Sequence, residues 1–358
     1  MTDNAGHLEA GTLIAGKFRI LRLLGAGGMG AVYEIEHELT KHRRALKLLH
    51  AQYKAYPAVV TRFLREASAA GRIGNPHIIE TFDAGELDSG EPYLVMEMLE
   101  GRTLSDELGA QGVMPVPTLA SLMRQACIGV QAAHEAGIVH RDLKPENVML
   151  VRNQSRPDFV KILDFGLAKV QGVDDPYTIH SQRDIFGTPY YMSPEQIRAE
   201  GVDARSDIYA VGALMFRMLT GKYVFRESNT FDILKAHLME PPPRMSSVLG
   251  SPVPEALEQI VAKALAKDPA QRFESMEALA EAIQKAQQSG FARASDLPIV
   301  EPVPVKPAAP VLEPVQSAPH VAQTDDEEDD EPTSGPALQP NRWRMAAFVL
   351  VPLLLVAA

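Results

Sequence analysis

The sequence lacks the cysteines that a disulfide framework or a multi-cysteine metal site would need. Its one cysteine, Cys127, lies among Met123, Ala126 and Val130 in a segment typical of a buried helix, so we expect an inert core thiol. Such scarcity of cysteine fits a reducing, cytoplasmic environment.

Basic charge is also scarce. Lys and Arg total 35 against 46 Asp and Glu, and the formal net charge is -11. The unbroken acid run from Asp325 to Glu331 carries seven of these negative charges, so the rest of the chain is only weakly acidic. The sequence therefore has no basic footprint for nucleic acid. Residues 1–17 lack the basic start and apolar core of a secretory signal, and we expect a flexible leader there.

Composition divides the remaining chain into three regions. Residues 18–288 alternate apolar-periodic segments with turn signals, and we find no internal repeat in them. In residues 289–341 prolines are interleaved with Ala, Val and Glu and are followed by the acid run. Such a segment buries too little apolar area to offset its ordering entropy, so we expect a disordered linker. Residues 342–358 begin with Arg342-Trp343-Arg344 and end in an uncharged, mostly aliphatic stretch.

The apolar stretch Met345–Ala358 is short for a membrane span. At about 1.5 Å per residue it covers roughly 21 Å, against a hydrocarbon core of about 30 Å. Because it follows the linker with no domain to pack against, we expect a transmembrane segment cut short where this sequence ends, with a partly inserted tail as the alternative. Arg342 and Arg344 on its N-terminal side predict that the preceding domain is cytoplasmic and anchored at the inner membrane.

The order of the predicted elements indicates an α+β fold with two lobes. Residues 18–24, 31–36 and 45–49 have the pattern of strands, and residues 60–72 have helical spacing. The later part is dominated by helices, of which residues 119–136 and 207–220 are the clearest, and Gly221 is suited to end the second. A strand-rich beginning followed by a helical remainder would enclose a cleft between the lobes.

A glycine-rich segment, Gly25-Ala26-Gly27-Gly28-Met29-Gly30, lies between the first two predicted strands. Glycines at this spacing let the backbone approach a phosphate closely. The same spacing also marks dinucleotide-binding loops, and a plain hairpin is the simplest interpretation. A dinucleotide loop runs from a strand into a helix, whereas Ala31-Val32-Tyr33 continues as a strand, so the context argues against a dinucleotide site.

The strongest signal is the run His140-Arg141-Asp142-Leu143-Lys144-Pro145-Glu146-Asn147. Phosphoryl transfer needs such a set: Asp142 to orient the hydroxyl and accept its proton, Lys144 as a cation for the transferring phosphate, and Asn147 as a magnesium ligand. Asp164, in Asp164-Phe165-Gly166, follows a predicted strand and is the natural second metal ligand. Chance is a remote explanation for the two motifs at this separation.

Together these motifs resemble the eukaryotic-like (Hanks-type) serine/threonine protein kinases of bacteria, over residues 18 to about 288. The resemblance implies a two-lobed kinase fold that uses ATP and Mg²⁺ to phosphorylate serine or threonine in protein substrates. It makes Lys47 the phosphate-binding lysine and Glu66, in the next helix, its ion-pair partner. Met96 would back the adenine pocket, and the backbone from Glu97 to Leu99 would pair with adenine. The positions that it assigns to ATP binding are Leu24, Gly25, Ala26, Gly27, Gly28, Met29, Gly30, Val32, Ala45, Lys47, Met96, Glu97 and Leu99.

The segment after Asp164 carries the regulatory predictions. Thr178 and Ser181 are the candidate sites of activating autophosphorylation, for which a homodimer is a natural arrangement, and ordinary loop hydroxyls are the alternative. Thr188 is expected to face the substrate hydroxyl. Ser193 departs from the alanine that the family usually has before Pro194-Glu195, and Arg272 is the expected partner of Glu195.

Two other classes of function remain open from the residues alone. The first is an ATP-binding scaffold without activity, which would be indicated by a missing Lys47, Asp142 or Asp164, and none is missing. The second is a small-molecule phosphotransferase. Such enzymes lack a segment like Gly187–Glu195, so that segment favours a polypeptide substrate.

Overall fold

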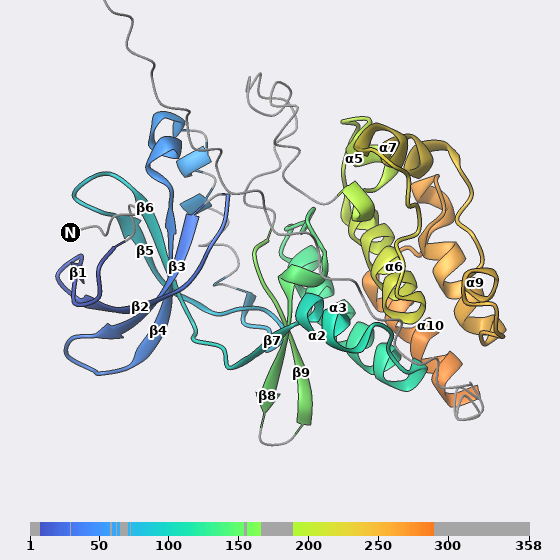
Figure 1. Ribbon diagram of the computed structural model, residues 1–358, viewed down its shortest axis with the longest axis horizontal. Helices are drawn as coiled ribbons and strands as arrows, with labels where there is room; N and C mark the ends of the chain where they lie inside the picture. The colour runs from blue at the N-terminus through green and yellow to red at the C-terminus, as the bar shows by residue number, and fades with distance from the viewer. Residues whose placement is uncertain are drawn as a thin grey trace, which may run out of the picture. The chain divides into compact units, whose positions relative to one another are not determined.

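The computed structural model describes residues 8–28, 30–57, 59–61, 63–64, 71, 73–153, 156–165 and 189–289. An antiparallel sheet of six strands forms the N-terminal part, with the order β1-β2-β3-β4-β6-β5 (Figure 1). Its strands are β1 (Leu13–Ile14), β2 (Phe18–Ala26), β3 (Gly30–His37), β4 (Arg43–Leu49), β5 (Thr81–Glu86) and β6 (Pro92–Met96), and the 3-10 helix η1 (Ala51–Ala55) follows β4.

Side chains alternate between two hydrophobic clusters, one on each face of this sheet. In β4, Leu46 packs in one cluster while Ala45 and Leu49 pack in the other. In β6, Val95 and Met96 divide in the same way. This period of two is the pleat of a strand, and it turns every second residue of β4 and β6 toward the same face.

A three-stranded sheet, in the order β7-β8-β9, begins the second part of the fold. It consists of β7 (Gly101–Thr103), β8 (Val148–Asn153) and β9 (Arg156–Ile162). The described helices of this second part are α2 (Leu104–Gln111), α3 (Val116–Glu135), η2 (Pro145–Asn147), η3 (Pro189–Tyr191), α5 (Pro194–Ile197), α6 (Ala204–Thr220), α7 (Thr230–Met239), α8 (Met245–Leu249), α9 (Glu255–Ala264), η4 (Pro269–Gln271) and α10 (Met276–Ser289).

Helix α6 supplies much of the large core, and nearly all of its residues are buried. Asp203 caps its first turn, and Gly221 ends it with a φ of 67°, a left-handed conformation that glycine adopts without strain. Cys127, on α3, is wholly buried in the same core. The predicted core position of this free thiol is confirmed, and burial raises its pKa to about 12, which disfavours the reactive thiolate.

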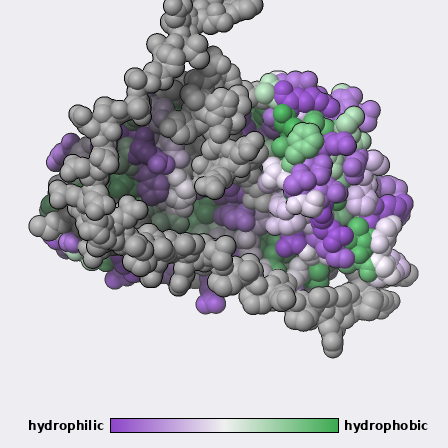
Figure 2. All heavy atoms as spheres, turned by 45° about the horizontal axis from the view of Figure 1, so that its top comes forward, coloured by the Kyte–Doolittle hydropathy of each residue, from purple (hydrophilic) through white to green (hydrophobic). Residues whose placement is uncertain are grey.

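The surface of the helical part mixes apolar and polar side chains on the face that Figure 2 shows. Two large apolar side chains on α7 are conspicuous for their exposure, Phe231 at 75% and Met239 at 73%. Isolated exposed apolar residues of this kind are ordinary on soluble domains.

The predicted elements agree with the structure to within a few residues. The three predicted strands correspond to β2, β3 and β4, and the two clearest predicted helices correspond to α3 and α6. The described part of residues 60–72 is helical. In the described part of the chain, no helix combines the length and apolarity that a membrane crossing requires. The predicted linker and membrane segment, residues 290–358, and residues 1–7 of the leader lie outside the described residues.

Candidate active site

Strand register assembles the first wall of the site. In the β4–β6 ladder Ala45 lies opposite Met96, and in the β3–β4 ladder Val32 lies opposite Lys47. Val32, Ala45 and Met96 accordingly pack in one hydrophobic cluster on the face of the sheet that also carries Lys47. The structure thus brings together an apolar wall and a lysine from three strands, as an adenine ring and its phosphates would need.

The glycine-rich turn between β2 and β3 is open on one side. A Cβ added at Gly25 or Gly27 would meet no atom within 4 Å, whereas one at Gly30 would lie 2.1 Å from the carbonyl oxygen of Leu48. Gly30 is therefore required for the approach of β3 to β4, while Gly25 and Gly27 leave room for a ligand beside the backbone. The Gly27 amide donates to the Gly30 carbonyl at 2.9 Å, which closes the turn.

Lys47 is joined to a residue 117 positions away. Its Nζ donates to Oδ1 of Asp164 at 2.6 Å, and its side chain is 14% exposed against 42% for that of Asp164. Asp164 has a φ of 45°, which an L-residue adopts at some cost. The strand that leads to it is tied to the first lobe, because Ile79 donates to the Ile162 carbonyl at 3.0 Å.

Asp207 of α6 binds the segment between α3 and β8 through backbone hydrogen bonds. One carboxylate oxygen accepts from the backbone amide of His140 and the other from that of Arg141, each at 2.8 Å. His134, at the end of α3, lies 2.7 Å from the same carboxylate. Arg141 has a φ of 64°, and these charge-assisted hydrogen bonds stabilise that strained turn.

His140 joins this segment to the one that carries Asp164. Its Nε2 lies 2.9 Å from the carbonyl oxygen of Leu163, and its ring packs on Phe165. Burial lowers the pKa of His140, although the nearby carboxylates of Asp207, Asp142 and Asp164 oppose that shift. The imidazole is therefore a neutral structural link at physiological pH.

The polar groups of Asp142, Lys144 and Asn147 converge. Lys144 Nζ lies 2.8 Å from Oδ2 of Asp142. Asn147 donates its amide Nδ2 to the backbone carbonyl of Asp142 at 2.8 Å and to its carboxylate at 3.2 Å. Because Nδ2 faces Asp142, the carbonyl oxygen of Asn147 is the end of that side chain left for a metal ion.

The donor set suits magnesium. Asn147 and Asp164 present oxygen atoms, which Mg²⁺ prefers, and this ion commonly takes only one or two protein ligands besides phosphate oxygens and water. Among the residues that the structure describes, no three or more His, Cys, Asp or Glu side chains are grouped to hold a metal ion. Asn147 and Asp164 together match the number and kind of protein ligands that Mg²⁺ commonly takes.

Comparison with known proteins decides the family. The family model described as the protein kinase domain matches residues 18–283. The chain belongs to the protein kinase family. Within it, the chain is a member of the bacterial Hanks-type serine/threonine kinases, as its motifs predicted.

The chain is similar to several bacterial kinases. It is 42% identical over 301 residues to the serine/threonine-protein kinase Pkn1 of Myxococcus xanthus, covering 82% of this chain and 43% of Pkn1. It is 39% identical over 261 residues to PknD of Mycobacterium tuberculosis strain H37Rv, covering 73% of this chain and 38% of PknD. The chain thus spans less than half the length of these curated relatives.

Among solved structures, the chain is similar to the PknI kinase domain of Mycobacterium tuberculosis. The TM-score is 0.61 and the sequence identity 28%, and the match covers 78% of this chain and 99% of that domain. This likeness confirms the kinase fold with a β-rich N-lobe and a helical C-lobe.

Glu97, which is predicted to lie in the kinase hinge, makes a link that sequence reasoning missed. Oε1 of Glu97 accepts from the backbone amide of Glu80 at 2.8 Å and from Nζ of Lys161 at 2.5 Å. Lys161 lies on β9, three residues before Asp164, so the side chain of Glu97 is tied to the strand that leads to a predicted metal ligand. A charged pair separated by 64 residues leaves no local pattern that would have revealed it.

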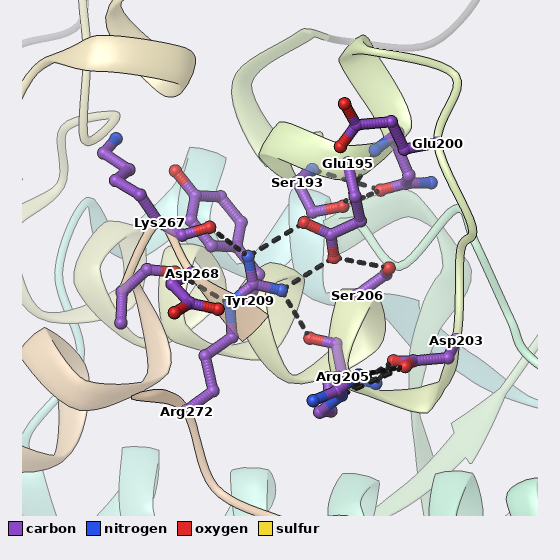
Figure 3. A network of polar contacts seen from close by, with 12 residues as sticks. Ser193, Glu195, Glu200, Asp203, Arg205, Ser206, Tyr209, Lys267, Asp268 and Arg272 are labelled. Carbon is purple, nitrogen blue, oxygen red and sulfur yellow. Dashed lines mark hydrogen bonds and ion pairs between the residues drawn. The ribbon is translucent and has the colours of Figure 1, made fainter. Parts of the chain in front are cut away.

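The kinase segment after Thr188 is anchored by an ion pair (Figure 3). Arg272 donates to both carboxylate oxygens of Glu195, at 2.7 and 2.9 Å, and Ser206 donates to one of them at 2.6 Å. Burial acts to raise the pKa of Glu195, but these hydrogen bonds outweigh it and lower the pKa. The predicted Glu195–Arg272 pair is therefore present.

Ser193, the departure from the usual alanine, has a local role. Its hydroxyl accepts from the amide of Gln196, whose side chain accepts in return from the Ser193 amide at 3.1 Å. This capping box begins helix α5. The Gln196 side chain also donates to the carbonyl of Arg141 at 2.7 Å, and so links α5 to the segment that contains Asp142.

Several predicted kinase residues are outside the described part of the chain. They are Met29, Glu66, Thr178, Ser181 and Thr188. The expected Lys47–Glu66 ion pair therefore stays a prediction, and the partner that the structure gives Lys47 is Asp164.

Proposed function

We propose that the chain is a protein kinase that transfers the γ-phosphate of ATP to serine or threonine hydroxyls of other proteins. The observation that carries this proposal is the convergence of Lys47 on Asp164 at 2.6 Å together with that of Lys144 on Asp142 at 2.8 Å. Two cations and two carboxylates from three separate segments are what phosphoryl transfer requires, because positioning and charge stabilisation supply most of its rate.

ATP is held by the apolar wall and the glycine turn. Val32, Ala45 and Met96 cover the adenine ring, the hinge backbone from Glu97 to Leu99 pairs with its edge, and Leu24 closes it from β2. Gly25 to Gly30 lie over the phosphates, where the open space beside Gly25 and Gly27 accommodates them. Lys47 directs its ammonium group at the phosphates from the floor of the sheet.

Asp142 acts on the acceptor hydroxyl. Its carboxylate orients the hydroxyl and accepts the proton as the oxygen attacks the γ-phosphorus, while the bond from the γ-phosphorus to the bridging oxygen breaks and ADP leaves. Lys144, beside that carboxylate, places positive charge where the transferring phosphoryl group passes. When bound by Asn147 and Asp164, Mg²⁺ would offset the charge that develops on the phosphate oxygens.

A labelled-ATP assay tests the proposal. The full chain is incubated with labelled ATP and Mg²⁺, with and without a generic basic protein, and label on serine and threonine of that protein is the expected result. Lys47→Met should abolish transfer while the chain stays folded. Label recovered only on small molecules would instead favour the small-molecule phosphotransferase, and no transfer at all would favour the scaffold.

Activation by autophosphorylation completes the proposed function. Nε of Arg141, beside Asp142, is buried and makes no hydrogen bond within the described residues, so it is available to an anion. A phosphate on Thr178 or Ser181 would supply that anion and order the segment, and a homodimer would allow one copy to modify the other. Mass spectrometry of active enzyme should find phosphate between Val170 and Phe186, and its absence there would contradict this step.

The proposed anchoring rests on residues 342–358. With the apolar stretch in the membrane and Arg342 and Arg344 on the cytoplasmic side, the kinase domain would reach cytoplasmic ATP on its linker. Cell fractionation should recover the full chain with membranes and a chain stopped at Gln339 in the soluble fraction. Identical, wholly soluble behaviour of the two would refute anchoring.

A further inference from the structure

The residue before the proposed general base is strained, and side chains from two helices hold its backbone. Arg141 has a φ of 64°, in the left-handed region that L-residues enter at some cost. Its backbone amide donates to Oδ1 of Asp207, on α6, at 2.8 Å. Its carbonyl accepts from Nε2 of Gln196, on α5, at 2.7 Å. A strained turn persists where its surroundings fix it, and these two contacts fix both polar groups of the residue.

The peptide group between Arg141 and Asp142 is therefore held on both sides. The carbonyl of Arg141 and the amide of Asp142 belong to one rigid plane. Gln196 binds the carbonyl side, and Nδ1 of His140 accepts from the Asp142 amide at 3.2 Å. The orientation of this plane sets the direction in which the side chain of Asp142 leaves the backbone, and so where its carboxylate lies. Gln196 and Asp142 also line one small cavity together with Lys144.

The side-chain amide of Gln196 is itself oriented. Its Oε1 accepts from the backbone amide and from the hydroxyl of Ser193, each at 3.1 Å. Because two donors occupy Oε1, the amide nitrogen is the end that faces the Arg141 carbonyl. Ser193 stands where the family usually has alanine and is 0% exposed, so its hydroxyl gives Gln196 a second donor away from water. The start of α5 thus aims one amide donor at the Arg141 carbonyl.

Helix α5 is a firm base for this donor. Glu195, the neighbour of Gln196, is bound through both carboxylate oxygens by Arg272 and through one of them by Ser206 (Figure 3). Glu195, Arg272 and Ser206 are all buried. A side chain on an element held in this way keeps a more precise geometry than one on a loop.

We propose that Gln196 is a positioning residue. It orients the peptide group between Arg141 and Asp142, and through it the Asp142 carboxylate that accepts the proton of the substrate hydroxyl. The inference rests on the proposed function, in which Asp142 is that base. The wall proposed for ATP is built from β3, β4 and β6 and not from α5. Loss of the Gln196 donor should therefore lower the rate of transfer and leave ATP binding unchanged.

The experiment measures kcat and KM for ATP with the full chain, labelled ATP, Mg²⁺ and a generic basic protein. Gln196→Glu is the sharpest variant, because glutamate has nearly the same shape and also completes a capping box with Ser193. Its carboxylate has no proton to donate and sets an acceptor against the Arg141 carbonyl. We expect kcat to fall by about 10–100-fold, since a misplacement of about 1 Å can cost about 100-fold, with KM for ATP unchanged. Thermal unfolding verifies that the variant is folded.

A double variant tests whether Gln196 acts through Asp142. Gln196→Glu added to Asp142→Asn should lower kcat by less than about twofold, because the group that Gln196 positions is already disabled. Ser206→Ala is the matched control, since it removes one buried hydrogen bond to α5 and leaves the Arg141 carbonyl untouched. Independent losses in the double variant, or a loss of kcat in Ser206→Ala as large as that in Gln196→Glu, would overturn the inference.

Ser193→Ala is a second test that does not depend on the folding of Gln196→Glu. It introduces the residue that is usual in the family and removes one of the two donors to Oε1 of Gln196. Because one neutral hydrogen bond is lost, kcat should fall by about twofold to fivefold, again with KM for ATP unchanged. A kcat equal to that of the wild type in either folded variant refutes the inference alone. A wild-type chain that transfers no phosphate refutes the proposed function with it.

Discussion

His237 should make the stability of the kinase domain depend on pH. Its pKa is lowered from 6.5 to about 3 in the folded chain, chiefly by burial. The unfolded chain therefore binds a proton in a range where the folded chain does not. Stability is fully present above the unfolded pKa and is lost as pH falls from about 6.5 toward 3.

The size of the effect follows from the two pKa values. From about pH 7 to about pH 5 this one histidine should lower the free energy of unfolding by about 2 kcal/mol, with a limit of about 5 kcal/mol in strong acid. That loss is a large fraction of the stability of an ordinary domain, which is roughly 5–15 kcal/mol. His140, whose pKa is also lowered by burial, adds to the total, so the wild-type slope alone does not isolate His237.

Urea unfolding of the wild-type chain and of His237→Gln, at about pH 7 and about pH 5, separates the contribution of His237 from that of His140. Glutamine has a similar polar end and does not titrate in this range. The variant should be less stable at neutral pH yet lose about 2 kcal/mol less on acidification, because His140 contributes equally to both chains. Equal losses in the two chains would show that His237 is not held neutral by its surroundings.

The other predictions test the catalytic and structural groups. Asp142→Asn should preserve folding and ATP binding and lower kcat by about 10²–10⁴, the usual contribution of a positioned general base, and near wild-type turnover would contradict its role. Arg272→Met leaves the Glu195 carboxylate buried without its partner, so calorimetry should record a destabilisation of about 3–5 kcal/mol. Gly30→Ala places a Cβ 2.1 Å from the Leu48 carbonyl oxygen and should raise KM for ATP more than the same change at Gly25, where the space is open.

Much of the fold was predictable because its signals are local. The alternation in β2 to β4, the helical period of α3 and α6, and the glycine that ends α6 are properties of neighbouring residues, so the sequence alone indicated them. The ends of the predicted strands and helices differed from the observed ends by a few residues, because strand pairing and helix caps extend an element beyond its apolar pattern. The burial of Cys127 was also predictable, because its apolar neighbours recur at helical spacing.

The candidate site divides in the same way. Asp142, Lys144 and Asn147 lie within one short motif, and a loop of six residues holds them close whatever surrounds it. The sequence by itself therefore determined the chemistry of the site and the family of the chain. The resemblance of the sequence to the family also implied that Arg272 is the partner of Glu195, and the structure contains that pair.

Only the tertiary structure decided which distant groups meet. Lys47 reaches Asp164 because the register of β3, β4 and β6 turns it to the inner face and Ile79 ties β9 to the first lobe. The Glu97–Lys161 link, the contact of His134 with Asp207 and that of His237 with Tyr209 arise where separate elements pack. The two residues of each of these contacts are 28 to 117 positions apart in the sequence. Only the packing of the fold brings them within hydrogen-bond distance. No pattern of neighbouring residues encodes that distance.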